Sequence, residues 1–222
     1  NIDIIKGDFL QLDLTELITS STLFSDKSKV VANLPYYITS PAILELLRNS
    51  RLFERLVLLV QREVAERIVA APGSKEYGAF SVAVQYHAQP EIIATVPPEA
   101  FWPQPKVDSA VIRILVCDTP TIKTIDEEIF FSVVRGGFSK RRKTILRALS
   151  MAGKTFPKLS RIREDSIRQV LLEVGVDSKR RAETLSLNEF SKIADAIAFK
   201  CGELNRNGRN DIYKSFKREN EF

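Results

Sequence analysis

Residues 33–36 (Asn-Leu-Pro-Tyr) combine side chains that can hold a flat ring with exocyclic N–H groups. They end an apolar run, which places them at the end of a predicted strand, where open α/β sheets bind ligands. Leu34 precedes a proline and is therefore expected to be extended. Pro35 has no N–H to compete for nearby carbonyls. Backbone carbonyls and the Asn33 amide would then accept both N–H bonds of an adenine N6 beside an aromatic face. The alternative is a turn whose tyrosines only pack.

A basic stretch supplies a second candidate site. Residues 135–147 carry six positive charges and no negative one. Such a run either forms a solvated helix face or binds RNA phosphates. For the second reading the candidates are Arg141, Arg142, Lys143 and Arg147. Lys106 is a weaker candidate for a phosphate contact, because it could instead pair with Asp108.

Bulk composition excludes several classes of protein. The chain has 222 residues, of which 44% are hydrophobic, and a net charge of +5, which favours a polyanionic partner. One histidine and two distant cysteines argue against a metal site, a histidine-based triad or a disulfide framework. No apolar run is long enough to cross a membrane. We therefore expect no metal, no membrane association and a cytoplasmic location.

The positions of the candidate residues depend on the predicted elements. Apolar runs predict strands, and periodic patterns predict helices. The strands are expected at 2–5, 29–33, 55–61, 80–88 and 109–116. The helices are expected at 40–49, with Ser40 as the N-cap and Pro41 at the first helical position, and at 62–71. This alternation predicts an α/β layer structure with a largely parallel sheet.

The pattern changes beyond residue 117. Only helical patterns follow, which predicts a small all-helical C-terminal domain. The predicted domains are therefore 1–118 and 119–200, with a polar tail at 201–222.

Several stretches together resemble one family. "NLPYYITSP" (33–41) resembles the motif of the KsgA/RsmA rRNA adenine dimethyltransferases. "KGDFL" (6–10) is similar to that family's acidic fourth-strand motif, and "FWPQPKVDSAVIRI" (101–114) is similar to its F-x-P-x-P-K-V-D-S block. "GGFSKRRKTILRAL" and "RAETLSLNEF" resemble its C-terminal signatures. The blocks occur in the family's order and cover nearly all of residues 1–200.

The resemblance implies a Rossmann-like class I methyltransferase sheet and S-adenosylmethionine-dependent dimethylation at N6 of two adjacent adenosines near the 3′ end of small-subunit rRNA. It implies that Asp8 and Asn33 contact the cofactor and that Asn33 and Leu34 hold the target amine. Pro35 completes the motif, and Tyr36 and Phe101 stack on the target base. The implied partner is a 30S-type pre-ribosomal particle, and we expect a monomer with residues 119–200 binding rRNA.

The chain also departs from the family pattern. Nothing in it matches the Gly-rich E-x-G-x-G-x-L-T cofactor loop or the acidic residue after the family's second strand, so we expect the first strands of the sheet to be missing. One alternative is a catalytically disabled rRNA-binding or assembly module. A second is an Erm-type large-subunit rRNA methyltransferase, and a third is a relative of the mitochondrial transcription factors. The 101–114 block and the R-A-E-T-L-S stretch favour the small-subunit reading.

Overall fold

The computed structural model describes residues 2, 4–20, 27–160 and 162–205, and the chain forms two compact units. The first unit comprises residues 1–123 and 182–187, and the second comprises 124–181 and 188–222. The sequence patterns had grouped 182–187 with the helical domain. The structure joins this segment to the first unit, where the Gly73 N–H donates to the Glu183 carbonyl at 2.7 Å.

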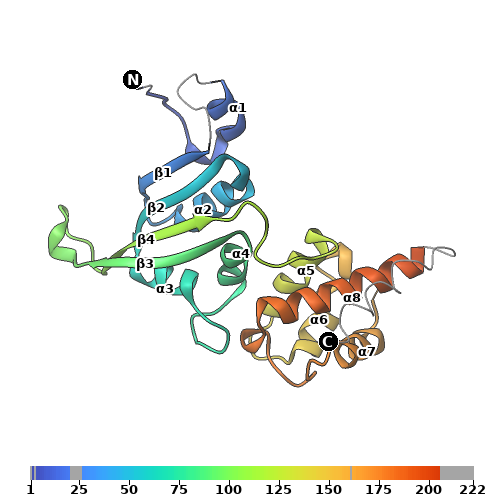
Figure 1. Ribbon diagram of the computed structural model, residues 1–222. Helices are drawn as coiled ribbons and strands as arrows, with labels where there is room; N and C mark the ends of the chain where they lie inside the picture. The colour runs from blue at the N-terminus through green and yellow to red at the C-terminus, as the bar shows by residue number, and fades with distance from the viewer. Residues whose placement is uncertain (1, 3, 21–26, 161, 206–222) are drawn as a thin grey trace. The chain divides into compact units, whose positions relative to one another are not determined.

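The first unit is built on a four-stranded sheet in the order β1-β2-β4-β3 (Figure 1). Its strands are β1 (Ser28–Asn33), β2 (Phe53–Gln61), β3 (Ala88–Val96) and β4 (Ser109–Val116). β1 pairs with β2 in parallel, whereas the β2–β4 and β4–β3 pairs are antiparallel. The mixed α/β class is confirmed. The expected largely parallel sheet is wrong for the described strands, because β3 returns to β4 without a crossover helix.

Helices cover one face of this sheet. The unit contains α1 (Leu14–Thr19), α2 (Thr39–Arg48), α3 (Arg62–Val69) and α4 (Ala79–His87), with short 3-10 turns at Phe9–Gln11, Ser50–Leu52, Pro98–Ala100 and Ala182–Thr184. Alternate residues of β2 and β4 are fully buried in one apolar core with residues of α2, α3 and α4. This burial holds the strand ends that carry the candidate site.

Two predicted strands are wrong. Residues 80–87 belong to α4 rather than to a strand, and Ala88 is the first residue of β3. Ser81 and Gln85, one helical turn apart, both reach carbonyls at the end of α3: the Ser81 hydroxyl donates to Arg67, and the Gln85 amide donates to Ile68 and Ala70. Only a helix brings these two side chains close enough to do so. In the other segment, the described residues 2, 4 and 5 lie outside any strand.

One strand was not predicted. β3 contains Pro90, which lowers the strand signal of its sequence. The structure places β3 at the edge of the sheet, where a proline costs no ladder hydrogen bond if its nitrogen faces outward.

The second unit is helical in its described part. It contains α5 (Glu127–Phe138), α6 (Ile145–Ala152), α7 (Glu164–Glu173) and α8, which begins at Leu187 and ends at Asn205, with a 3-10 turn at Pro157–Leu159. Buried Asp195 of α8 accepts 2.8 Å hydrogen bonds from the Thr124 hydroxyl and the Ile125 N–H. Gly136 allows α5 and α6 to pack closely, because a Cβ at this position would lie 2.8 Å from the Ala152 Cβ. The unit therefore has its own close-packed core.

Candidate active site

The loop that follows β1 is attached to the sheet at one end and to α2 at the other. The Leu34 N–H donates to the Leu59 carbonyl of β2 at 3.3 Å, which extends the parallel pairing one residue beyond the strand. The Pro35 carbonyl then accepts from the Ile38 N–H and from the Thr39 hydroxyl, both at 3.1 Å. The backbone of the loop is therefore held from both sides.

These contacts explain why the predicted helix start is wrong. α2 begins at Thr39, and the residue before it, Ile38, makes no side-chain cap. Ser40 is thus inside the helix rather than its N-cap. The helix begins two residues earlier than predicted because the Pro35 carbonyl accepts from both the Ile38 N–H and the Thr39 hydroxyl.

Two polar groups of the loop stay available to a ligand. The side-chain amide of exposed Asn33 forms no hydrogen bond with any residue in the described part of the chain. The Leu34 carbonyl likewise accepts none from the described residues, whereas the Pro35 carbonyl is already used. The loop therefore offers the Asn33 oxygen and the Leu34 carbonyl as free acceptors.

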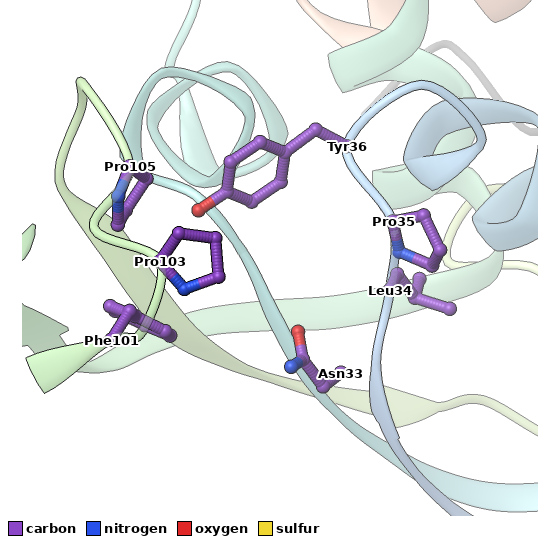
Figure 2. A pocket seen from close by; sticks show the side chains of 7 residues that line it. All are labelled: Asn33, Leu34, Pro35, Tyr36, Phe101, Pro103 and Pro105. Atoms are coloured by element: carbon purple, nitrogen blue, oxygen red, sulfur yellow. The ribbon is translucent and has the colours of Figure 1, made fainter.

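Tyr36 is anchored to a distant strand. Its hydroxyl lies 2.9 Å from the Ser109 Oγ, and Ser109 is fully buried at the first position of β4. This bond fixes the half-buried Tyr36 ring, which extends from the loop toward Pro103 and Pro105 (Figure 2). Ser109 was not predicted as a site residue, although it belongs to the K-V-D-S stretch.

The loop and the connector between β3 and β4 line an open cavity of about 310 Å³. Its lining residues are Asn33, Leu34, Pro35, Tyr36, Phe101, Pro103 and Pro105 (Figure 2). The structure thus brings together all five residues predicted to hold the target base, although they lie up to 68 positions apart in the sequence. Pro103 and Pro105 were not predicted. The cavity is at the small end of ligand pockets, which suits a single nucleobase.

Asp8 stands apart from this lining. It is exposed at the start of the Phe9–Gln11 turn, where its carboxylate accepts hydrogen bonds from the Leu10 N–H and the Gln11 amide, each at 3.1 Å. A carboxylate offers about four acceptor positions, so Asp8 keeps capacity for an adenine amine. Phe9 packs on the apolar core and ties this turn to the first unit.

Lys106 does not form the predicted alternative pair with Asp108. Asp108 instead accepts from the Arg62 guanidinium at 3.3 Å, and its carbonyl accepts from the Arg62 N–H at 3.0 Å. Hydrogen bonds from Arg62 to Glu66 and, less strongly, to Asp108 raise the pKa of Arg62 above its ordinary value. Lys106 is left exposed, with no hydrogen bond or ion pair among the described residues. Lys106 and Arg62 both line a second cavity of about 480 Å³.

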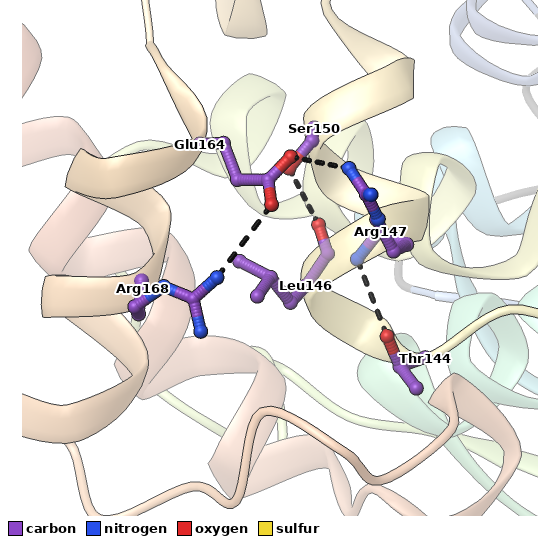
Figure 3. Close-up of polar contacts among 6 residues, drawn as sticks. All are labelled: Thr144, Leu146, Arg147, Ser150, Glu164 and Arg168. Atoms are coloured by element: carbon purple, nitrogen blue, oxygen red, sulfur yellow. Dashed lines mark hydrogen bonds and ion pairs between the residues drawn. The ribbon is translucent and has the colours of Figure 1, made fainter.

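The basic candidates of the second unit divide into two groups. Arg141, Arg142 and Lys143 occupy the turn between α5 and α6, which we call the basic turn, and all three are exposed. Their side chains form no ion pair within the described part of the chain. Arg147, in α6, instead pairs with Glu164 at 2.8 Å, and Glu164 also lies 3.6 Å from Arg168 (Figure 3).

Two classes of site find no support among the described residues. No group of three or more His, Cys, Asp or Glu side chains is arranged there to hold a metal ion. None of the helices in that part of the chain is both long and apolar enough to span a bilayer.

Comparison with known proteins decides the family. The sequence profile of "Ribosomal RNA adenine dimethylase" matches residues 1–197. The chain belongs to this family. The family is one of enzymes that depend on S-adenosylmethionine and act on rRNA. The predicted membership and the Rossmann-like α/β class are therefore confirmed.

Curated relatives agree with this assignment. The "Ribosomal RNA small subunit methyltransferase A" of Alkaliphilus oremlandii is 43% identical over 201 residues, covering 90% of this chain and 67% of that protein. The protein of the same description from Shouchella clausii is 43% identical over 199 residues, covering 89% of this chain and 65% of the relative. The chain thus spans about two thirds of the length of these relatives.

Solved structures show a similar architecture. A dimethyladenosine transferase from Plasmodium falciparum superposes with a TM-score of 0.61 at 27% identity, covering 78% of this chain and 67% of that one. The 23S rRNA methyltransferase ErmE superposes with a TM-score of 0.59 at 21% identity, covering 89% of this chain and 72% of that one. The second likeness concerns the fold alone.

Proposed function

We propose that this chain carries out S-adenosylmethionine-dependent N6,N6-dimethylation of two adjacent adenosines near the 3′ end of small-subunit rRNA. One observation carries the proposal: a base-sized cavity combines two free acceptors, from Asn33 and Leu34, with the rings of Tyr36 and Phe101. The small-subunit relatives support this substrate over a large-subunit one.

The proposed chemistry needs positioning rather than a strong base. The N6 lone pair of adenine is delocalised into the ring, so the amine is a poor nucleophile. Hydrogen bonds from its two N–H groups to the Asn33 oxygen and the Leu34 carbonyl favour a pyramidal nitrogen. They also stabilise the positive charge that develops there. Such preorganised acceptors act where charge appears in the transition state.

The target base must leave its stack to enter the cavity, which costs a few kcal/mol. Stacking on an aromatic ring returns about 1–3 kcal/mol per base. Tyr36, held by Ser109, and Phe101 supply rings that are already in place before the base arrives.

S-adenosylmethionine, when bound, supplies the methyl group as a sulfonium electrophile. Two of the residues present fit this cofactor: Asp8 has acceptor capacity for its adenine amine, and the Asn33 amide is exposed and free at the end of β1. We propose these two as its contacts within this chain.

The remaining assignments complete the proposal. Residues 1–118 act as the methyltransferase domain, and residues 119–200 bind rRNA through the basic candidates. Of the predicted polar tail at 201–222, residues 201–205 belong to α8, and the remainder lies outside the described residues. The protein works as a monomer in the cytoplasm on a 30S-type pre-ribosomal particle, and Lys106 contacts a phosphate near the target.

The test combines cofactor binding with methyl transfer. The 222-residue chain is titrated calorimetrically with S-adenosylmethionine at low salt, then incubated with the cofactor and small-subunit rRNA. Saturable one-to-one binding and N6,N6-dimethyladenosine in the digested RNA are expected. Tyr37→Phe serves as the matched control, because Tyr37 is exposed and lies outside the cavity lining. A folded chain that neither binds the cofactor nor transfers methyl groups would overturn the proposal.

A further inference from the structure

Trp102 is exposed in a way that folding does not explain. Its side chain is 97% exposed, although a tryptophan gains more from burial than almost any other residue. Both of its sequence neighbours, Phe101 and Pro103, line the cavity proposed for the target base. The indole therefore lies at the rim of that cavity without belonging to its lining.

The chain holds Trp102 at this position before any ligand binds. Four prolines lie within residues 97–105, and each restricts the backbone φ angle. The Ala100 and Phe101 N–H groups donate to the Pro97 and Pro98 carbonyls, each at 3.1 Å. Phe101 is extended (φ −120°, ψ 151°), and successive side chains of an extended segment point to opposite sides. With Phe101 at the cavity, Trp102 faces outward.

A free cation lies four residues further along. Lys106 is exposed and has no partner among the described residues, since Arg62 occupies Asp108. An exposed ring and an unpaired lysine on the same short connector are the combination that binds single-stranded RNA, in which the ring stacks on a base and the cation meets the backbone. A helical RNA would not offer its bases to such a ring, whereas a strand that has released a base for methylation does.

We propose that Trp102 stacks on the base of a nucleotide directly next to the target adenosine, and that Lys106 contacts the phosphate of that nucleotide. This inference rests on the proposed function and extends its site by one nucleotide. It assigns Trp102 a positioning role, because the indole touches the neighbouring nucleotide and not the reacting nitrogen. Contacts to this neighbouring nucleotide would determine which nucleotide of the RNA chain enters the cavity.

Trp102 is the only tryptophan in the chain, so its fluorescence reports the proposed contact directly. The chain is titrated with a single-stranded RNA oligonucleotide that carries the two adjacent adenosines, and tryptophan emission is recorded. Binding is measured separately by the anisotropy of a fluorescein-labelled copy. We expect the emission to be quenched in parallel with binding. An abasic nucleotide on one side of the target should abolish the quenching, and one on the other side should not.

Variants give the second readout. Trp102→Ala should weaken oligonucleotide binding about 5- to 100-fold, while Trp102→Phe, which can still stack, should recover most of the affinity. Lys106→Gln should lower the slope of log affinity against log salt by about 0.7, the contribution of one phosphate on single-stranded RNA. Leu172→Ala, at an 80% exposed position in the second unit, is the control for loss of exposed apolar surface and should change neither quantity.

The outcomes separate this inference from the proposed function. Oligonucleotide binding with unchanged tryptophan emission would overturn the inference alone. So would equal affinities of the Trp102→Ala variant and the unsubstituted chain, and Trp102 would then be available to a protein partner instead. A folded chain that shows no anisotropy change with any RNA would overturn both.

Discussion

The cavity of the first unit and the basic turn of the second unit expose polar groups for different purposes. In the cavity, the free acceptors are the Leu34 carbonyl and the side-chain oxygen of Asn33, and both residues belong to a segment whose backbone is hydrogen-bonded to β2 and to α2. In the basic turn, Arg141, Arg142 and Lys143 are long side chains with no ion-pair partner among the described residues. Fixed acceptors discriminate one chemical group, whereas exposed cations attract any phosphate backbone. The cavity would therefore provide specificity for the target base, and the basic turn would provide affinity for the RNA backbone.

The largest effect should come from removing the cavity amide. Asn33→Ala should slow methyl transfer by about 10²–10³-fold, because one of two preorganised acceptors is lost from the reacting amine. RNA affinity should hardly change, since the basic turn is intact. Single-turnover rates and anisotropy titrations measure the two quantities. Loss of RNA affinity as large as the loss of rate would break the division between the two regions.

Neutralising the basic turn should have the converse effect. The triple variant Arg141→Gln, Arg142→Gln, Lys143→Gln should lower the slope of log affinity against log salt by about 2 and weaken RNA binding roughly tenfold to hundredfold at moderate salt. The rate of the bound complex should remain near that of the unsubstituted chain.

Arg147→Gln is the matched comparison for the triple variant. Glu164 already pairs with Arg147, so this change should alter the salt slope less than the loss of any one cation of the basic turn. Salt titrations of the single variants provide the measurement. An equal or larger effect at Arg147 would mean that Glu164 releases it when RNA binds.

A smaller effect is expected from the core of the second unit. Gly136→Ala should destabilise this unit by about 1–3 kcal/mol, because the new methyl group would overlap the Ala152 Cβ. Chemical denaturation followed by circular dichroism gives the free energy of unfolding. Gly202→Ala is the control, because no atom lies within 4 Å of its added Cβ, and a helical alanine should be neutral or stabilising. Equal stabilities of the two variants would show that α5 and α6 can move apart without cost.

The smallest effect concerns the anchor of the Tyr36 ring. Tyr36→Phe removes the hydrogen bond to buried Ser109 and should cost about 0.5–1.5 kcal/mol in transition-state stabilisation, or in stability. Methyl-transfer rates and thermal denaturation test this. Tyr37→Phe should change neither, because Tyr37 is 86% exposed and its hydroxyl makes no hydrogen bond among the described residues. If Tyr36→Phe behaves like Tyr37→Phe, the anchor does not position the ring.

Local sequence signals and the family resemblance together located most of the candidate site. The buried run before Asn33 and the proline after Leu34 were enough to predict an extended segment at a strand end. The resemblance of residues 101–114 to the family's F-x-P-x-P-K-V-D-S block implied Phe101, on a proline-rich connector before β4. What local signals did not reveal were the partners across the fold. Ser109 as the anchor of Tyr36, and Arg62 as the partner of Asp108, lie 73 and 46 residues away from the groups they bind.

The secondary-structure elements that were predicted incorrectly also depend on contacts between distant segments. Residues 80–88 are rich in valine and aromatic side chains, as strands are, yet Ser81 and Gln85 bond to the end of α3 and residues 80–87 are helical. β3 was missed because the cost of Pro90 depends on whether its strand lies at an edge. The strand directions were also misjudged, since pairing is decided by which strands meet in the folded sheet.

The sequence by itself determined the α/β class and, through motifs that resemble those of one family, the family and five of the seven residues that line the cavity, because each of these depends on residue types within short stretches of chain. Only the tertiary structure decided which groups are free. Lys106 remains available because Arg62 pairs with Asp108. The Asn33 oxygen and the Leu34 carbonyl remain available because no described residue donates a hydrogen bond to them. Such availability depends on distances between segments far apart in the chain, and no local pattern encodes them.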